Sequence, residues 1–288
     1  MKKRQALEKG VAGLFFLCAC VSIVAVLLIC YFLFANGIPA MKEIGVFDFL
    51  FGTTWAPKNE PASFGILPMI VGSICVTLGA IVIGVPIGIL TAAFLARFCP
   101  KPLHGLLEPM VQLMAGIPSI IYGFFGMVVL VPLLRNIPGC TGVSLLAAAL
   151  LLGIMILPTV INLSESAIRA VPESYYEGSL ALGATHERSV FFAVLPAAKS
   201  GILAAIVLGI GRAIGETMAV IMVAGNQAVL PRGLLKGVRT MTANIVLEMG
   251  YATGIHREAL IATGVVLFIF ILMINLIFAV IKKKGERV

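Results

Sequence analysis

The chain has 288 residues, of which 60 % are hydrophobic and only 12 % are charged, and its mean hydropathy is +1.09. Soluble domains carry roughly 25 % charged residues because water must solvate their surface, so this composition excludes a water-soluble globule. The net charge of +8 does not call for a nucleic-acid partner, because the basic residues are distributed as membrane topology requires. We therefore expect an all-α, polytopic transmembrane helical bundle of about six helices, forming a single domain over residues 1–288.

The first half of the chain contains three long apolar runs. Val11–Phe34 is uncharged over 24 residues, which is too long for a signal-peptide core, so we expect an anchor helix over residues 11–34 that is not cleaved. Ala62–Ala96 is longer than one span needs, and its part around Pro68 is expected to enter the membrane obliquely or to lie at the interface. Pro109–Leu134 is uncharged over 26 residues and predicts a third span.

Three further spans are predicted in the second half. The fourth span falls between Arg135 and Glu165, at about Val143–Leu163. The next runs from about Ala197 to Ala224, and it is the only span that charged residues interrupt. Ala259–Ile281 is uncharged over 23 residues and predicts the last span.

The orientation follows from the lysines and arginines. If both termini face the cytoplasm, thirteen of these residues lie on the cytoplasmic side and seven on the other side. Because basic residues are enriched in cytoplasmic segments, we predict an N-in, C-in topology in the cytoplasmic (inner) membrane. The connections Ala35–Ser63 and Gly225–Arg257 are then external, and Ser164–Lys199 is cytoplasmic. Loops of this length in a compact protein usually have a function.

The cytoplasmic connection contains a predicted helix. Ser174–Leu182 favours a helix, Gly183 suits its C-cap, and Pro196 marks the entry to the next span. An ordinary amphipathic helix between two spans is an equally good interpretation on physical grounds alone.

The same connection also has a motif-like spacing. Glu177-Gly178-Ser179 is followed by Gly183 and then by Leu195-Pro196, and this spacing resembles the EAA loop of ABC importer permeases. In that family the loop forms a coupling helix that sits in a groove of a cytoplasmic ATPase. The chain departs from the family pattern in having Gly178-Ser179 in place of two alanines, and Ala193 where a larger aliphatic residue is common.

The charged residues inside the predicted span Ala197–Ala224 are Arg212 and Glu216. They stand four residues apart, so a continuous helix would place them on one face, where they can pair. A charge at the centre of a membrane costs about 2.5–3.5 kcal/mol, so two such residues need partners and usually line a pathway. A purely structural ion pair within the helix is the alternative interpretation.

A break in the third predicted span is indicated by Pro118, in the run Ala115 to Gly126. Proline removes a backbone hydrogen bond and kinks or breaks a helix. A helical segment that starts near Pro118 would offer free N–H groups to an anion, with Ser119 adding a hydroxyl. A kink that only serves packing is equally compatible with the segment.

Taken together, these segments resemble the phosphate-uptake permeases of the Pst system. The run Gly-Ile-Pro-Ser-Ile-Ile-Tyr-Gly-Phe-Phe-Gly is similar to one in both Pst permeases, and Gly211 to Val220, Gly225-Asn226 and Arg239 to Ile245 look specifically like the PstC subunit. The resemblance covers about residues 64–281, which form the permease core, with the coupling loop at residues 164–199. It implies the type I ABC importer permease fold.

The resemblance also implies partners and site residues. The partners are a PstA-like second permease in a heterodimer, two copies of a cytoplasmic ATPase, an external phosphate-binding protein, membrane lipids and inorganic phosphate, without nucleic acid. The implied substrate pathway contains Arg212, Glu216, Thr217, Ser119 and Tyr122. The residues implied in ATPase coupling are Glu177, Gly178, Ser179, Gly183, Leu195 and Pro196.

The chain lacks the sequence G-x-x-x-x-G-K-[ST], so we expect a transporter subunit without an ATPase site, not an enzyme, with ATP bound by the partner ATPase. The six cysteines and three histidines have no ligand-like spacing, so we predict no metal site and no cofactor in this chain. Import of another oxyanion, such as sulfate or molybdate, is the alternative function. An ion-coupled secondary transporter that uses Arg212 and Glu216 as a proton relay is a more distant one.

Overall fold

A computed structural model describes residues 2–285; Met1 and residues 286–288, including Arg287 from the topology count, lie outside the described residues. The described chain is helical apart from one two-residue strand pair. In chain order, the elements are α1 (Lys2–Ile44), α2 (Val46–Phe51), β1 (Trp55–Ala56), β2 (Ser63–Phe64), α3 (Leu67–Ala93), the π-helical η1 (Phe94–Phe98), α4 (Lys101–Gly116), α5 (Ser119–Phe125), the π-helical η2 (Gly126–Leu130), α6 (Val131–Arg135), α7 (Leu145–Arg169), α8 (Glu173–Ala181), α9 (His186–Ser189), the π-helical η3 (Val190–Val194), α10 (Leu195–Ala197), α11 (Lys199–Gly215), α12 (Met218–Val223), α13 (Met241–Met249) and α14 (Gly254–Gly285).

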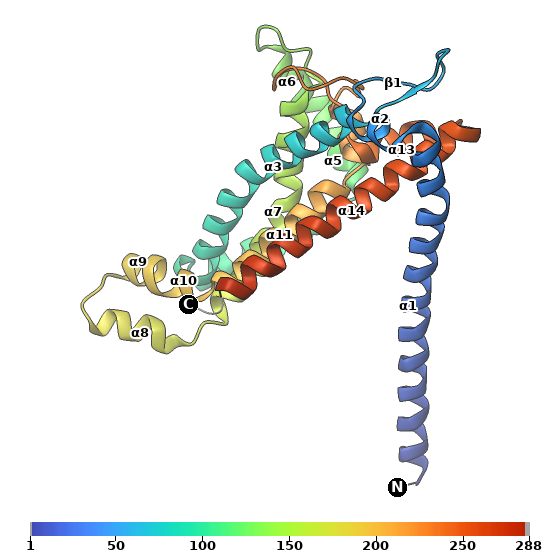
Figure 1. Cartoon of the computed structure of the whole chain (residues 1–288). Helices are drawn as coiled ribbons and strands as arrows, with labels where there is room; N and C mark the ends of the chain where they lie inside the picture. The colour runs from blue at the N-terminus through green and yellow to red at the C-terminus, as the bar shows by residue number, and fades with distance from the viewer. Residues whose placement is uncertain (1, 286–288) are drawn as a thin grey trace.

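Within the described residues, four helices are long and apolar enough to cross a membrane: α1, α3 with η1, α7 and α14. Two bent helix pairs also qualify, which gives up to six spans and confirms the predicted number. Figure 1 shows that α1 begins and α14 ends in the half of the molecule that also contains α8 and α9. The segments around β1, α2 and α13 lie at the opposite end, as the predicted topology requires.

The centre of the bundle is the crossing of α3 and α7, which run side by side in Figure 1. Glycines on α3 make the close approach possible. A Cβ atom at Gly84 would lie 2.7 Å from the carbonyl oxygen of Gly153 and 2.8 Å from Ile156, and one at Gly88 would lie 2.7 Å from Val160. In a membrane, where apolar burial gives no net drive, such small-residue contacts allow the dispersion contacts that hold helices together.

The segments between α1 and α3 and between α12 and α14 form a cap at one end of the bundle (Figure 1). We call residues 45–66 and 225–256 the cap. Its apolar centre includes Phe49, Trp55, Phe64 and Met241, all of them buried. Gly52 and Gly65 cross there so closely that a Cβ atom at Gly52 would lie 2.8 Å from the Cα of Gly65. The two predicted external connections are therefore one packed unit.

Helix α1 is longer than the predicted span of residues 11–34, because no residue between Lys2 and Ile44 ends the helix; Pro39 is accommodated within it. It stands away from the bundle along most of its length (Figure 1) and approaches α14 only towards its end. There Phe34 meets Phe268 edge to face, and Gly37 lies against Val265. The apolar side chains of residues 14–29 that remain exposed suit contact with lipid.

Two predicted spans are broken. Pro109–Leu134 was predicted as one span that Pro118 kinks or breaks, and the break is confirmed: α4 ends at Gly116, α5 begins at Ser119, and the two halves meet at an angle of 97°. The physical reason is Pro118, which cannot donate a backbone hydrogen bond and keeps the preceding residue extended. Ala197–Ala224 was expected to be continuous, but α11 ends at Gly215 and α12 begins at Met218.

The start of the cytoplasmic connection also differs from the prediction. Residues 164–169 were assigned to this loop because of their charges, but they form the last turns of α7. Glu165 is in fact buried, with 6 % of its surface exposed. At the other end of the chain, α3 begins at Leu67 with Pro68 in its first turn, so residues 62–66 precede the helix. Proline is favoured there, because the first N–H groups of a helix have no intrahelical partner.

Candidate functional site: two broken helices and a coupling loop

The break between α11 and α12 lies at Glu216 and Thr217. Glu216 has an extended backbone, and its carboxylate oxygen Oε1 accepts hydrogen bonds from the backbone N–H groups of Thr217 (3.0 Å) and Ala219 (3.2 Å). The carboxylate thus supplies the acceptor that the start of α12 lacks, and its charge complements the positive end of the helix dipole. The interruption between helices is therefore stabilised by Glu216 itself.

The predicted ion pair between Arg212 and Glu216 is wrong. It required a continuous helix, whereas α11 ends before Glu216 and the Glu216 carboxylate binds the backbone of α12. Among the ion pairs of the described side chains, none includes Arg212. Its only side-chain hydrogen bond in that part of the chain is a long one, 3.5 Å from Nη1 to the hydroxyl of Thr159 on α7.

Arg212 lies where three helices meet. The hydroxyl of Tyr122 on α5 donates a hydrogen bond of 2.8 Å to the carbonyl of Met114 on α4. Thr159 approaches the guanidinium from α7. The sequence interpretation missed Thr159, although a threonine directly after Pro158 in an otherwise apolar span was a usable signal.

The two broken helices pack against each other. A Cβ atom at Gly123 of α5 would lie 3.0 Å from the Cα of Ala219 of α12, so a glycine is needed at this crossing. Ser119 is the first residue of the seven-residue α5, and the hydroxyl of Thr217 donates to the carbonyl of Gly215. The structure therefore places Glu216 and Thr217 at one break and Ser119 and Tyr122 after the other, in helices that pack together, while no described hydrogen bond joins Ser119 to Arg212, Glu216 or Thr217.

The cap reaches the same break from the other side. The hydroxyl of Thr242 on α13 donates a hydrogen bond of 3.1 Å to the backbone carbonyl of Glu216. Thr242 and Thr240 share a second hydrogen bond of 3.1 Å, and Thr240 caps α13 through the N–H of Ala243. A carbonyl that the interrupted helix leaves without a backbone partner is thus satisfied by the cap.

A buried carboxylate holds the cap together. Glu248 is 7 % exposed, and it accepts hydrogen bonds from Arg239 Nη1 (2.7 Å), Trp55 Nε1 (2.9 Å) and His256 Nε2 (2.9 Å). Burial alone would raise the pKa of this carboxyl. The hydrogen bonds from Trp55 and His256 and the charge of Arg239 outweigh burial, so the pKa is lowered from its usual value.

The cytoplasmic connection contains the predicted helix and its cap. Helix α8 spans Glu173–Ala181, and Gly183 has a φ of +86°, a left-handed conformation that favours glycine. The N–H of Gly183 donates to Leu180 and the N–H of Ala184 donates to Ser179, which is the Schellman arrangement. At this tip Leu182 is 91 % exposed.

The other residues predicted for ATPase coupling lie on both sides of this tip. Glu177 and Gly178 are exposed on α8, and Ser179 is partly buried. Leu195 and Pro196 lie in α10, directly before the 71° bend that leads into α11. The loop therefore presents exposed residues around its tip. Its second half ends in α10, which leads through this bend into α11.

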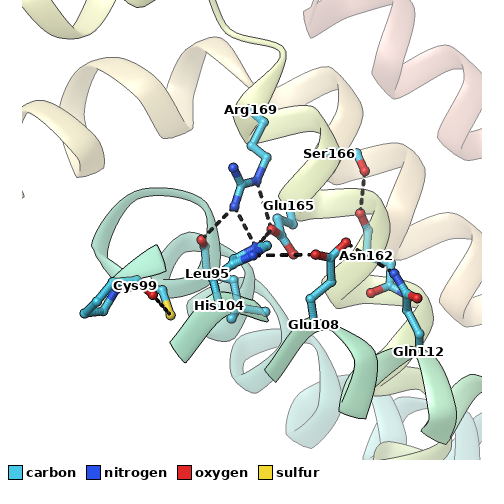
Figure 2. Close-up of polar contacts among 10 residues, drawn as sticks. Leu95, Cys99, His104, Glu108, Gln112, Asn162, Glu165, Ser166 and Arg169 are labelled. Carbon is cyan, nitrogen blue, oxygen red and sulfur yellow. Dashed lines mark hydrogen bonds and ion pairs between the residues drawn. The ribbon is translucent and has the colours of Figure 1, made fainter. Parts of the chain in front are cut away.

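Figure 2 shows a polar cluster at the base of this loop. The buried Glu165 of α7 accepts hydrogen bonds from Arg169 Nε (2.9 Å) and contacts His104 Nε2 of α4 at 2.8 Å. Arg169 Nη2 also donates to the carbonyl of Leu95 on η1 at 3.1 Å. The sequence interpretation did not find this cluster, because its members come from three segments up to 74 residues apart.

A helical bundle with two broken spans packed against each other, and a helical loop at one end, has the fold of a membrane permease of the type I ABC importer class, which is not an enzyme. The family profile of the binding-protein-dependent transport system inner membrane component matches residues 84–286, and the chain belongs to that family. It is accordingly a multi-pass inner-membrane permease, of a class that works with an ATPase and a binding protein.

Individual relatives agree with this assignment. The chain is 39 % identical to the probable ABC transporter permease protein YqgH of Bacillus subtilis, over 90 % of this chain and 86 % of that protein. It is 36 % identical to the phosphate transport system permease protein PstC of Mesorhizobium japonicum, over 84 % and 80 %. Its fold is similar to a chain of the inward-facing MetNI methionine ABC transporter, with a TM-score of 0.62, 22 % identity, and coverage of 76 % and 95 %.

Proposed function

We propose that the chain is the permease subunit of an ATP-driven importer of inorganic phosphate. The observation that carries the proposal is Arg212, a cation in an apolar span that has no carboxylate partner among the described side chains. A charge in that position is costly unless a counter-ion compensates it, and a transported anion is such a counter-ion. The planar guanidinium engages two oxygens of phosphate at once, and Thr159 adds a hydroxyl group beside it.

The relatives support phosphate as the anion. Curated PstC proteins from bacteria are 30–36 % identical to this chain over most of its length, and they are phosphate transport system permeases by name. We infer that the core over residues 64–281 pairs with a PstA-like permease, with residues 11–34 as an additional anchor helix. An external phosphate-binding protein would deliver the ion, and two copies of a cytoplasmic ATPase would bind ATP.

In this proposal the site residues divide into two groups. Arg212, Tyr122, Thr217 and Ser119 line the pathway, and Glu216 keeps the break open by holding the start of α12. A pathway must also release its ion, and the negative charge of Glu216 beside Arg212 limits how tightly phosphate is held. The ATPase contacts the second group, which is Glu177, Gly178, Ser179, Gly183, Leu195 and Pro196.

Phosphate uptake by the complete complex in proteoliposomes tests the proposal. Arg212→Gln should abolish uptake while the complex still assembles, and Arg212→Lys should recover little, because an ammonium lacks the planar fork. Arg257→Gln, at an exposed arginine of α14, is the matched control and should transport normally. Near-normal uptake by Arg212→Gln would remove the substrate role from this residue. Uptake of sulfate or molybdate in place of phosphate by the unaltered complex would support the other oxyanion function.

Glu216→Gln separates the two roles of the carboxylate. Glutamine keeps a side-chain oxygen for the N–H groups of Thr217 and Ala219 but has no charge. If the charge of Glu216 assists release, the variant should bind phosphate in the complex and transport it slowly. Normal transport by Glu216→Gln would show that the residue acts only by capping α12.

A further inference from the structure

Helix α4 is held to the rest of the chain by polar contacts rather than by apolar burial. None of its residues is buried. One face carries His104, Glu108 and Gln112, four residues apart, and these side chains point towards a polar face of α7 (Figure 2). Between the two helices lies a cavity of ≈ 550 Å³ lined by polar residues of both. What fixes α4 to α7 at this end is therefore the cluster around Glu165.

The cluster holds whichever nitrogen of His104 carries the proton. With a proton on Nε2, the ring donates to Oε1 of Glu165 over 2.8 Å. With the proton on Nδ1, Nε2 accepts from Nη2 of Arg169 over 2.7 Å, and Nδ1 faces Glu108 at 3.5 Å. Glu165 and Arg169 both belong to α7, so α4 keeps a hydrogen bond to α7 in either tautomer.

Contacts continue from this cluster to the coupling helix. Arg169 donates to the carbonyl of Leu95 on η1, and Arg97 of the same π-helix pairs with Glu173 at 2.8 Å. Glu173 is the first residue of α8. The start of the coupling helix, the end of α3 and the end of α7 are therefore connected by charge-assisted hydrogen bonds, which are about twice as strong as neutral ones.

Contacts continue from α4 to the pathway as well. The helix ends at Gly116, directly before the break at Ile117 and Pro118. Across this break the Tyr122 hydroxyl donates to the carbonyl of Met114. Displacement of α4 along its axis would therefore move Tyr122, on the helix that packs against α12.

We propose that the Glu165 cluster is a coupling junction that makes α4 move as one body with coupling helix α8, so that movement of α8 reaches the break at Pro118. This inference rests on the proposed transport function. Glu165, His104 and Arg169 are positioning residues, because they act on the pathway through α4 and do not touch the ion.

The experiment uses the complete complex in nanodiscs, with spin labels at Gly105→Cys in α4 and Ser174→Cys in α8, after the six native cysteines have been replaced. Both sites are exposed, and a side chain at position 105 meets no neighbour within 4 Å. We expect one narrow distance distribution that is the same in the nucleotide-free and ATP-bound complex. Glu165→Ala should broaden it, and so should His104→Ala, which leaves the last turn of α7 intact.

Transport gives the second measurement. Loss of a hydrogen bond to a charged group is expected to lower the phosphate transported per ATP hydrolysed by about tenfold in Glu165→Ala and His104→Ala. Glu108→Ala is the matched control and should change neither measurement. Glu108 is half exposed, and its contact with His104, at 3.5 Å, is longer than the 2.8 Å contact between His104 and Glu165.

Three outcomes would overturn the junction: a label distance that changes with ATP in the unaltered complex, a narrow distribution in Glu165→Ala, or normal coupling in both variants. The label distances do not depend on the transported ion. If the unaltered complex does not transport phosphate, the proposed function fails while the distances still decide whether the junction exists.

Discussion

Glu248→Gln tests whether one carboxylate holds the cap together. The carboxylate accepts three hydrogen bonds, from Arg239, Trp55 and His256, at 2.7–2.9 Å. An amide of the same shape has only one oxygen, so its NH₂ group must face a donor on one side. The variant loses at least one charge-assisted hydrogen bond, worth about 1.5–3 kcal/mol, and leaves Arg239, which is 17 % exposed, without its counter-charge. Breaking a buried pair in this way costs roughly 3–5 kcal/mol, so we expect the free energy of unfolding of the variant to be lower by about 3 kcal/mol.

The assay follows from the composition, because Trp55 is the only tryptophan of the chain and it lies in the network. Its fluorescence during denaturation of the purified chain in detergent therefore reports on the cap. At pH 7 the midpoint for Glu248→Gln should be lower than for the unaltered chain. Glu258→Gln, at an exposed glutamate of α14, is the control and should leave the midpoint unchanged.

Acid provides the second half of the test. The pKa of Glu248 is lowered in the folded chain from the ordinary value of 4.5, so its stabilisation is complete above that value and is lost as the pH falls through the lowered pKa. The glutamine variant has no such group and should not show this loss. A variant within 0.5 kcal/mol of the unaltered chain, roughly the noise of surface substitutions, would refute the reasoning. The reasoning would also be refuted if the denaturation midpoint of the unaltered chain, followed by Trp55 fluorescence, did not change with acid.

The remaining predictions concern the loop and the topology. Gly183→Asp should leave the chain inserted but uncouple ATP hydrolysis from uptake, because a side chain at φ +86° strains the turn after α8. The measurement is the stimulation of the ATPase by loaded binding protein. Normal stimulation would contradict the coupling role. A membrane-impermeant thiol reagent should label cysteines at Lys58 and Arg232 from outside but not one at Glu173, and external labelling at Glu173 would reverse the topology.

Hydropathy predicted where the chain is apolar, but not where helices end inside apolar runs. α7 and α14 were located by their apolar runs, but α7 continues to Arg169, beyond the predicted end at Leu163, and α14 begins at Gly254, before the predicted start at Ala259. The break at Pro118 had a visible cause, although its angle of 97° depends on packing against α12. The break at Glu216 had no proline to mark it. It exists because the carboxylate of Glu216 accepts a hydrogen bond from the start of α12. Thr242, 26 residues away, donates a hydrogen bond to the backbone carbonyl of Glu216.

The site residues also divide into those that local sequence determines and those that depend on distant segments. Gly183 was predictable, because a local turn decides its conformation. Arg212 stood out as a charge within a span, but its hydrogen-bond partner Thr159 is contributed by another helix, 53 residues away. Glu165 was misplaced for the same reason: a glutamate is expected in a loop unless a partner compensates its burial, and His104 lies 61 residues earlier.

The glycine-lined crossing of α3 and α7 has a consequence for biosynthesis. The two helices are each other's main partners, yet 76 residues separate the end of α3 at Ala93 from the end of α7 at Arg169. At translation rates of roughly 5–20 residues per second, the ribosome needs about 4–15 s to complete α7 after α3 has emerged. During that time the glycine face of α3 lacks its main partner in the folded bundle. Slower or interrupted synthesis between these residues therefore lengthens the one period in which the centre of the bundle has no partner.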